Sequence, residues 1–97
     1  MTVILHPGAE HDLNEAASFY EREGSPTLAA RFVTEFRRVA SLIGDRPDIS
    51  PSRGKGLRGI TMAGFPYTVI YRHDATQIKI LVVKHDRRRP GYGSGRS

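Results

Sequence analysis

The stretch LRGITMAGFPYTVIYRHDATQIKILVVKH, residues 57–85, decides the fold of this 97-residue chain. Apolar and polar side chains alternate along it, which is the period-two pattern of half-buried strands. The pattern predicts strands over residues 57–62, 65–72 and 77–85. The connections between them are short, as in antiparallel hairpins. We therefore expect a small, mostly antiparallel sheet in the second half of the chain.

Two helices are predicted ahead of this sheet. Apolar residues recur every three or four positions along residues 8–23, and again in the segment that ends near Gly44. Between the two segments, Gly24 can end a helix, Ser25 can cap the next one, and Pro26 is tolerated in its first turn. A connection this short predicts a helical hairpin.

A β-branched run at residues 2–6 predicts one further strand, so the expected order is β-α-α-β-β-β. This order is typical of an α+β fold in which a helical hairpin packs on one face of the sheet. The other face is then left to solvent or to a partner. A chain of this length forms one domain. We place this domain at residues 1–92 and expect the Gly- and Ser-containing tail, residues 93–97, to be disordered.

Charge is distributed unevenly along the chain. Residues 1–45 hold 4 Lys and Arg against 7 Asp and Glu, a net charge of −3, whereas residues 46–97 hold 11 against 3, a net charge of +8. A second half this basic predicts a negatively charged partner, such as a nucleic acid or an acidic protein segment.

Several classes of protein are excluded by composition. The chain has no cysteine, so it has no disulfide framework, no thiolate zinc site and no cysteine nucleophile. The histidines show no ligand spacing, and we expect neither a metal nor a cofactor. The longest run of strongly apolar residues, residues 80–83, is far too short to span a membrane, and no signal peptide is visible. We therefore expect a cytoplasmic protein.

Three segments of the second half carry a family resemblance: FPYTVIYR at residues 65–72, IKILVVKH at residues 78–85 and RRPGY at residues 88–92. They resemble the third strand, fourth strand and C-terminal signature of the RelE/ParE superfamily of toxins from bacterial type II toxin–antitoxin systems. The first half of the chain also resembles this superfamily, so the similarity extends over nearly the whole chain. It is closer to the ParE-like, plasmid-stabilisation branch than to RelE.

The resemblance implies a fold in which the first strand lies beside the last. It also implies a growth-inhibiting toxin that a cognate antitoxin wraps and neutralises, in a toxin–antitoxin hetero-oligomer. The target stays open, because ParE-like members are associated with inhibition of DNA gyrase, whereas RelE-like members cut messenger RNA on the ribosome. A third interpretation is a nucleic-acid-binding module without catalysis, held by phosphate contacts.

A metal-independent ribonuclease needs a proton donor or acceptor together with cations around the phosphate. The candidate catalytic residues for that activity are His85, Lys55, Arg58 and Arg72. Between Asp48 and Asp74 there is no carboxylate to act as a general base, which favours a binder over an enzyme.

The candidates for binding the target or the antitoxin are basic or aromatic: Arg53, Lys84, Arg87, Arg88, Arg89 and Tyr92. We expect the cations to pair with acidic groups of the antitoxin or with phosphate, and Tyr92 to stack on a base. The alternative for the arginines is a solvated basic tail, and the alternative for His85 is to cap a strand.

Overall fold

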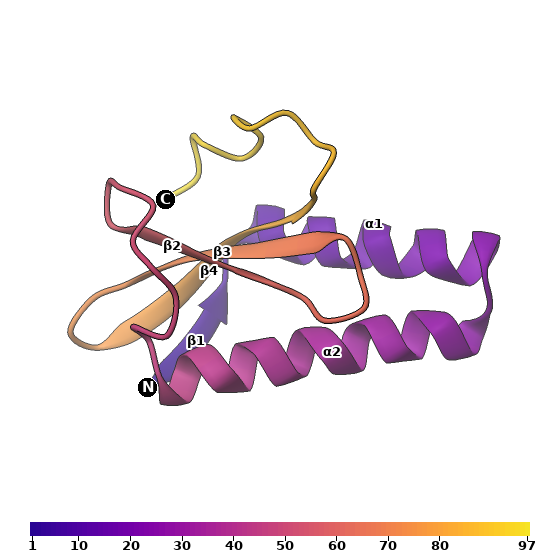
Figure 1. Ribbon diagram of the computed structural model, residues 1–97, viewed down its shortest axis with the longest axis horizontal. Coiled ribbons are helices and arrows are strands. Elements are labelled where there is room, and N and C mark those ends of the chain that lie inside the picture. Colours follow the sequence, from indigo (N-terminus) through magenta and orange to yellow (C-terminus); the bar gives the residue numbers. More distant parts are fainter.

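The computed structural model describes residues 1–97 and has the predicted order of elements. In chain order these are β1 (Thr2–Leu5), α1 (Pro7–Glu23), α2 (Pro26–Asp45), β2 (Leu57–Thr61), β3 (Tyr67–His73) and β4 (Gln77–His85). The two helices form a hairpin that packs on one side of the sheet (Figure 1). The predicted α+β fold is therefore confirmed.

The sheet has the strand order β1-β4-β3-β2. Strand β1 runs parallel to β4, and the other neighbours are antiparallel. The first strand thus lies beside the last, as the resemblance implied. Because β1 pairs with β4 only as far as Ile80, the edge of β4 from Leu81 to His85 has no strand beside it.

A β-bulge in the centre of the sheet sets which side chains face the helices. Ile70 pairs with Val82, but Tyr71 pairs with Ile80, so Leu81 is left without a partner. Leu81 and Val82 consequently lie in one cluster with Ile70, on the face away from the helices.

Local signals explain the helical hairpin. Ser25 accepts a hydrogen bond from the Leu28 N–H at 3.0 Å and caps α2, with Pro26 in the first turn. Helix α1 begins at Pro7, because the His6 ring nitrogen Nδ1 accepts from the Gly8 N–H at 2.9 Å. Histidine is an uncommon cap, so the start of α1 was predicted one residue late.

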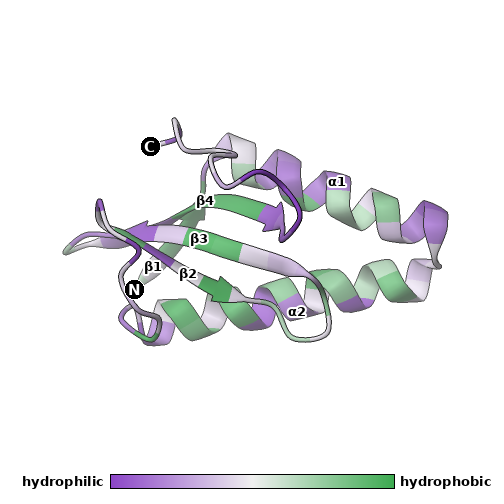
Figure 2. Ribbon diagram, turned by 45° about the horizontal axis from the view of Figure 1, so that its top comes forward, coloured by the Kyte–Doolittle hydropathy of each residue, from purple (hydrophilic) through white to green (hydrophobic).

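The main core lies between α2 and the sheet. Phe32, Val39 and Ile43 of α2 are completely buried against Val69 and Tyr71 of β3 and their neighbours. Figure 2 shows hydrophobic residues concentrated on β3, β4 and stretches of α2. Full burial of each of these side chains stabilises the fold by roughly 1.5–3 kcal/mol.

The C-terminal tail covers the centre of the opposite face. Ile70, Leu81 and Val82 are only 8%, 2% and 3% exposed there. A Cβ atom on Gly93 would lie 2.6 Å from Val82 Cγ2, so the tail packs directly on this cluster. Arg96 of this tail also binds Asp12 of α1, so the tail lies over an apolar sheet face that no helix covers. The disorder that the composition predicts for residues 93–97 stays a prediction.

Candidate functional site

The four candidate catalytic residues do not come together at one site. His85 pairs with Tyr67 at one end of β3, whereas Arg72 lies five positions further along that strand, roughly 17 Å away at the spacing of extended chain. The His85 ring contacts the Tyr67 ring on the helix side of the sheet, at 5.2 Å between centroids. Arg72 lies on the other face and reaches the Lys55 carbonyl oxygen at 3.5 Å. His85 and Arg72 therefore cannot act on the same phosphate.

Arg58 points to the helix side, where it is already paired. Its guanidinium lies 3.3 Å from the Asp48 carboxylate and donates to the Ser50 carbonyl oxygen. Asp48 also contacts His73 Nε2 at 3.0 Å. Arg58 thus holds the loop that precedes β2, and its charge is largely compensated inside the protein.

His85 lies in a pocket of about 260 Å³ between α1 and the end of β4. Its Nδ1 accepts the Arg87 N–H at 3.0 Å, so the neutral ring carries its proton on Nε2. Phe19, which is 47% exposed, lies at this pocket, and so does Tyr67. Burial raises the pKa of the Tyr67 hydroxyl. The bond from the Arg87 N–H ties His85 to the residues that follow β4.

Two of the candidate binding residues hold the tail in place. Lys84 is 8% exposed, and its Nζ donates to the Pro90 carbonyl oxygen at 3.3 Å. The Tyr92 hydroxyl donates to Asp12, and the guanidinium groups of Arg88 and Arg96 lie 4.5 Å and 5.1 Å from its ring centre. The Tyr92 ring is therefore occupied by its own protein, and this arrangement does not leave it free to stack on a base.

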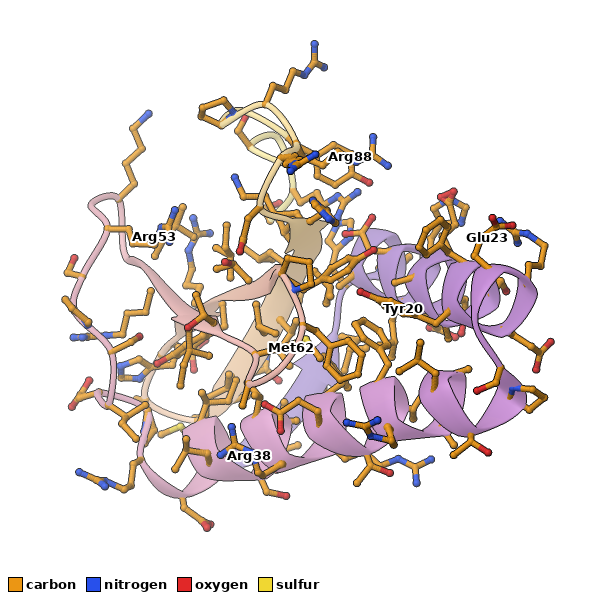
Figure 3. The ribbon with its side chains drawn as sticks, turned by 45° about the vertical axis from the view of Figure 1, so that its right-hand side comes forward. Tyr20, Glu23, Arg38, Arg53, Met62 and Arg88 are labelled. Carbon is orange, nitrogen blue, oxygen red and sulfur yellow. The ribbon has the colours of Figure 1, made fainter.

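The remaining candidates form two exposed basic surfaces. The first, the tail arginines, consists of Arg87, Arg88 and Arg89, which follow β4. The second, the basic groove, lies on the face away from the helices and has a volume of about 170 Å³. Its charged lining residues are Arg53, Lys55, Arg72 and Arg96. Figure 3 shows Arg53 beside the sheet and Arg88 on the tail, both far from Arg38 on α2.

Asp12 and Arg96 are central to this region, although neither is among the candidate residues predicted from the sequence. The Asp12 side chain is 3% exposed and accepts from the Val83 N–H at 3.1 Å, from Tyr92 and from Arg96. This hydrogen bonding to Asp12 raises the pKa of Arg96. The sequence did contain a signal that Asp12 is buried. Asp12 follows Ala9 by three positions and precedes Ala16 by four, so it lies on the buried stripe of α1.

The described residues contain no group of three or more His, Cys, Asp or Glu side chains that could hold a metal ion. Neither α1 nor α2 combines the length and the apolar character that crossing a membrane requires.

Comparisons with known proteins agree with this description. A family model described as "ParE toxin of type II toxin-antitoxin system, parDE" matches residues 3–90. Among solved structures, the chain is similar to one described as "Chromosomal ParDE TA system from P. aeruginosa", with a TM-score of 0.77 and 20% sequence identity. That match covers 88% of this chain and 95% of the other, and at this identity it shows a shared fold. No curated protein sequence matches the chain.

Proposed function

Because the chain belongs to the ParE toxin family of type II toxin–antitoxin systems, we propose that it inhibits growth by binding its target, and that this target is DNA gyrase. The chain is the toxin component of such a system, and its partner is a cognate antitoxin. We choose gyrase because ParE-like members of the superfamily are associated with its inhibition. Because DNA gyrase acts in the cytoplasm, we also propose that the protein is cytoplasmic.

The separation of His85 from Arg72 carries the preference for binding over cleavage. Cleavage of a phosphodiester requires a proton-transfer group and cations around a single phosphate. Here His85 lies at the opposite end of the sheet, and on the opposite face, from the candidate catalytic cations Lys55 and Arg72. Arg58, the remaining candidate catalytic cation, is paired with Asp48. Such an arrangement supports a protein that acts through its surface.

We assign contacts with the target or the antitoxin to the tail arginines and Arg53. These side chains are exposed and make no ion pair with a carboxylate of the chain. Interface arginines of this kind steer association and pair with acidic groups of a partner. Lys84 and Tyr92 contribute indirectly, by fixing the tail that carries the arginines.

The test combines induction in bacteria with purified components. Expression without antitoxin should arrest growth, and the purified chain should block gyrase supercoiling while primer extension finds messenger RNA intact. The double variant Arg87→Ala/Arg89→Ala should inhibit growth less than the wild type. Arg31→Ala/Arg37→Ala removes the same charge from the exposed surface of α2 and should keep full activity.

Two results would contradict the proposal. Cleavage of messenger RNA at translated codons, with gyrase unaffected, would assign the chain to the ribonuclease branch. Growth at the wild-type rate at every level of induction would show that this chain does not inhibit growth.

A further inference from the structure

We propose that the basic groove binds the phosphodiester backbone of nucleic acid and does not read the bases. This inference goes beyond the toxin action proposed above, and it does not depend on gyrase being the target. It would give the toxin a direct contact with nucleic acid in addition to its protein partners.

The first observation is uncompensated charge. Arg53, Lys55 and Arg72 border the groove, and none of them makes an ion pair with a carboxylate. The lining of the groove contains no acidic residue. On the strand next to Arg72, by contrast, Arg58 is paired with Asp48. Three unpaired cations around one hollow attract an anion with several charges.

The second observation is the backbone of the loop that presents Arg53 and Lys55. Gly54, Lys55 and Gly56 have φ angles of 85°, 56° and 75°, and Lys55 is the one non-glycine residue of the chain in the left-handed region. A side chain there costs free energy, so such a residue is a pointer to function. The loop is closed by a hydrogen bond of 2.7 Å from the Arg53 N–H to the Leu57 carbonyl oxygen.

The third observation is the space that Gly59 leaves for Arg53. A Cβ atom on Gly59 would lie 2.6 Å from Arg53 Nη1 and 2.9 Å from its Cδ. The missing side chain therefore allows Arg53 to lie against β2. Arg72 approaches the same loop from β3, at 3.5 Å from the Lys55 carbonyl oxygen. Two guanidinium groups held in this way can each donate paired hydrogen bonds to phosphate oxygens.

The floor of the groove favours nucleic acid over an acidic protein segment. Ile70, Leu81 and Val82 are at most 8% exposed, because the tail already covers them. A protein segment would thus find little apolar surface to bury, whereas a phosphate backbone is held by charge alone. The one aromatic residue in the lining, Tyr92, is occupied by the tail, so base stacking is not expected.

The experiment is a fluorescence anisotropy titration of labelled nucleic acid with the full chain. The probes are a duplex DNA of about 20 base pairs, the corresponding single-stranded DNA and a single-stranded RNA, between about 50 and 200 mM salt. We expect binding that weakens as salt rises. The three probes distinguish which polymer the groove prefers.

Matched variants locate the site. Arg53→Ala/Arg72→Ala should weaken binding at least about tenfold at the lowest salt and reduce the salt slope by about 0.9 for each lost phosphate contact. The control Arg31→Ala/Arg37→Ala removes the same charge from α2 and should change binding less than about twofold. Gly59→Ala should also weaken binding, because it displaces Arg53 without changing the charge. Circular dichroism should show that all three variants are folded.

The proposal would be overturned by any of three results: no binding of any probe by the wild type at the lowest salt, equal losses in the two double variants, or a polyglutamate peptide that binds as tightly as the nucleic acids. The last result would assign the groove to an acidic protein segment. Gyrase supercoiling is measured separately, so a failure of either proposal is distinguishable from a failure of the other.

Discussion

Arg96 Nη1 lies 2.6 Å from Asp12 Oδ2, which joins two residues 84 positions apart in the sequence. The same carboxylate oxygen accepts the Val83 N–H at 3.1 Å, and Arg96 also donates to the Leu81 carbonyl oxygen at 3.0 Å. Because β1 ends at Leu5, these side chains take the hydrogen bonds that a neighbouring strand would otherwise make with β4. The pair therefore makes the C-terminal tail a part of the fold.

Replacing Asp12 by alanine should lower the free energy of unfolding by about 2–4 kcal/mol, because it leaves the buried Val83 N–H and Arg96 without their acceptor. Arg96→Ala should cost less, about 1–2 kcal/mol, since the Arg96 side chain is 17% exposed. Urea unfolding measures both values. Arg89→Ala is the control and should be neutral; an Asp12→Ala variant as stable as that control would contradict the assigned role.

Gly93→Ala should loosen the tail. Gly93 has a φ of 78°, and an added Cβ would lie 2.6 Å from Val82 Cγ2, so the change is expected to cost about 1–3 kcal/mol. Limited proteolysis should cut the tail faster, and a hydrophobic dye should bind the uncovered cluster of Ile70, Leu81 and Val82. Gly91→Ala is the matched control, because an added Cβ there meets nothing within 4 Å. Equal proteolysis of the two variants would show that close packing at Gly93 does not hold the tail.

Stability should depend on pH through Glu35. Its carboxylate binds the Arg38 guanidinium at 2.7 Å and accepts the Ala63 N–H at 2.6 Å, and the bond to Arg38 is the main cause that lowers the pKa of Glu35. The folded state favours the charged form of Glu35. The Glu35 carboxylate therefore adds to the free energy of unfolding above its pKa in the unfolded chain, about 4.3, and this stabilisation is lost as pH falls through its lower pKa in the folded protein.

The stability difference between wild type and Glu35→Gln should therefore be larger at neutral pH than in acid, as measured by urea unfolding at both values. An NMR titration should also find the pKa of Glu35 higher in Arg38→Ala than in the wild type. A difference in stability that does not vary with pH would contradict this account.

Tyr71→Phe should lower the free energy of unfolding by about 1–2 kcal/mol. The Tyr71 hydroxyl donates to the Pro47 carbonyl oxygen at 2.7 Å and lies 3.2 Å from Ser50 Oγ, so it ties the loop before β2 to the core. Tyr67→Phe removes a hydroxyl that makes no hydrogen bond within the protein and should change stability little. Thermal unfolding compares the two variants, and equal losses would rule out the loop contact as the cause.

Much of the fold could be predicted because its signals are local. The alternation around Val69 and Tyr71 predicted β3, and both side chains are completely buried. The signals at Gly24, Ser25 and Pro26 predicted the helical hairpin. The β3 prediction began two residues early because Phe65 continues the alternation, although its carbonyl accepts the Tyr67 N–H in a turn.

The functional residues were harder to predict, because the role of each side chain depends on where it lies in the sheet. Lys84 has the sequence signature of a surface cation, but it is buried under the tail and bound to the Pro90 carbonyl. Arg58 and Arg72 lie on strands that pair directly, yet their side chains point to opposite faces. Alternation within each strand indicates a face, but not which face the helices cover.

The sequence by itself therefore determined the order of the elements and the helical hairpin, because periodicity, caps and turns are encoded within a few residues of one another. The toxin family was indicated separately, by the resemblance of residues 65–72, 78–85 and 88–92 to its members. Only the tertiary structure decided that Asp12 binds Arg96, that the tail covers the second face, and that His85 and Arg72 stay apart. These outcomes depend on the parallel pairing of β1 with β4 and on the register of β3 with β4, which bring together residues far apart in the chain.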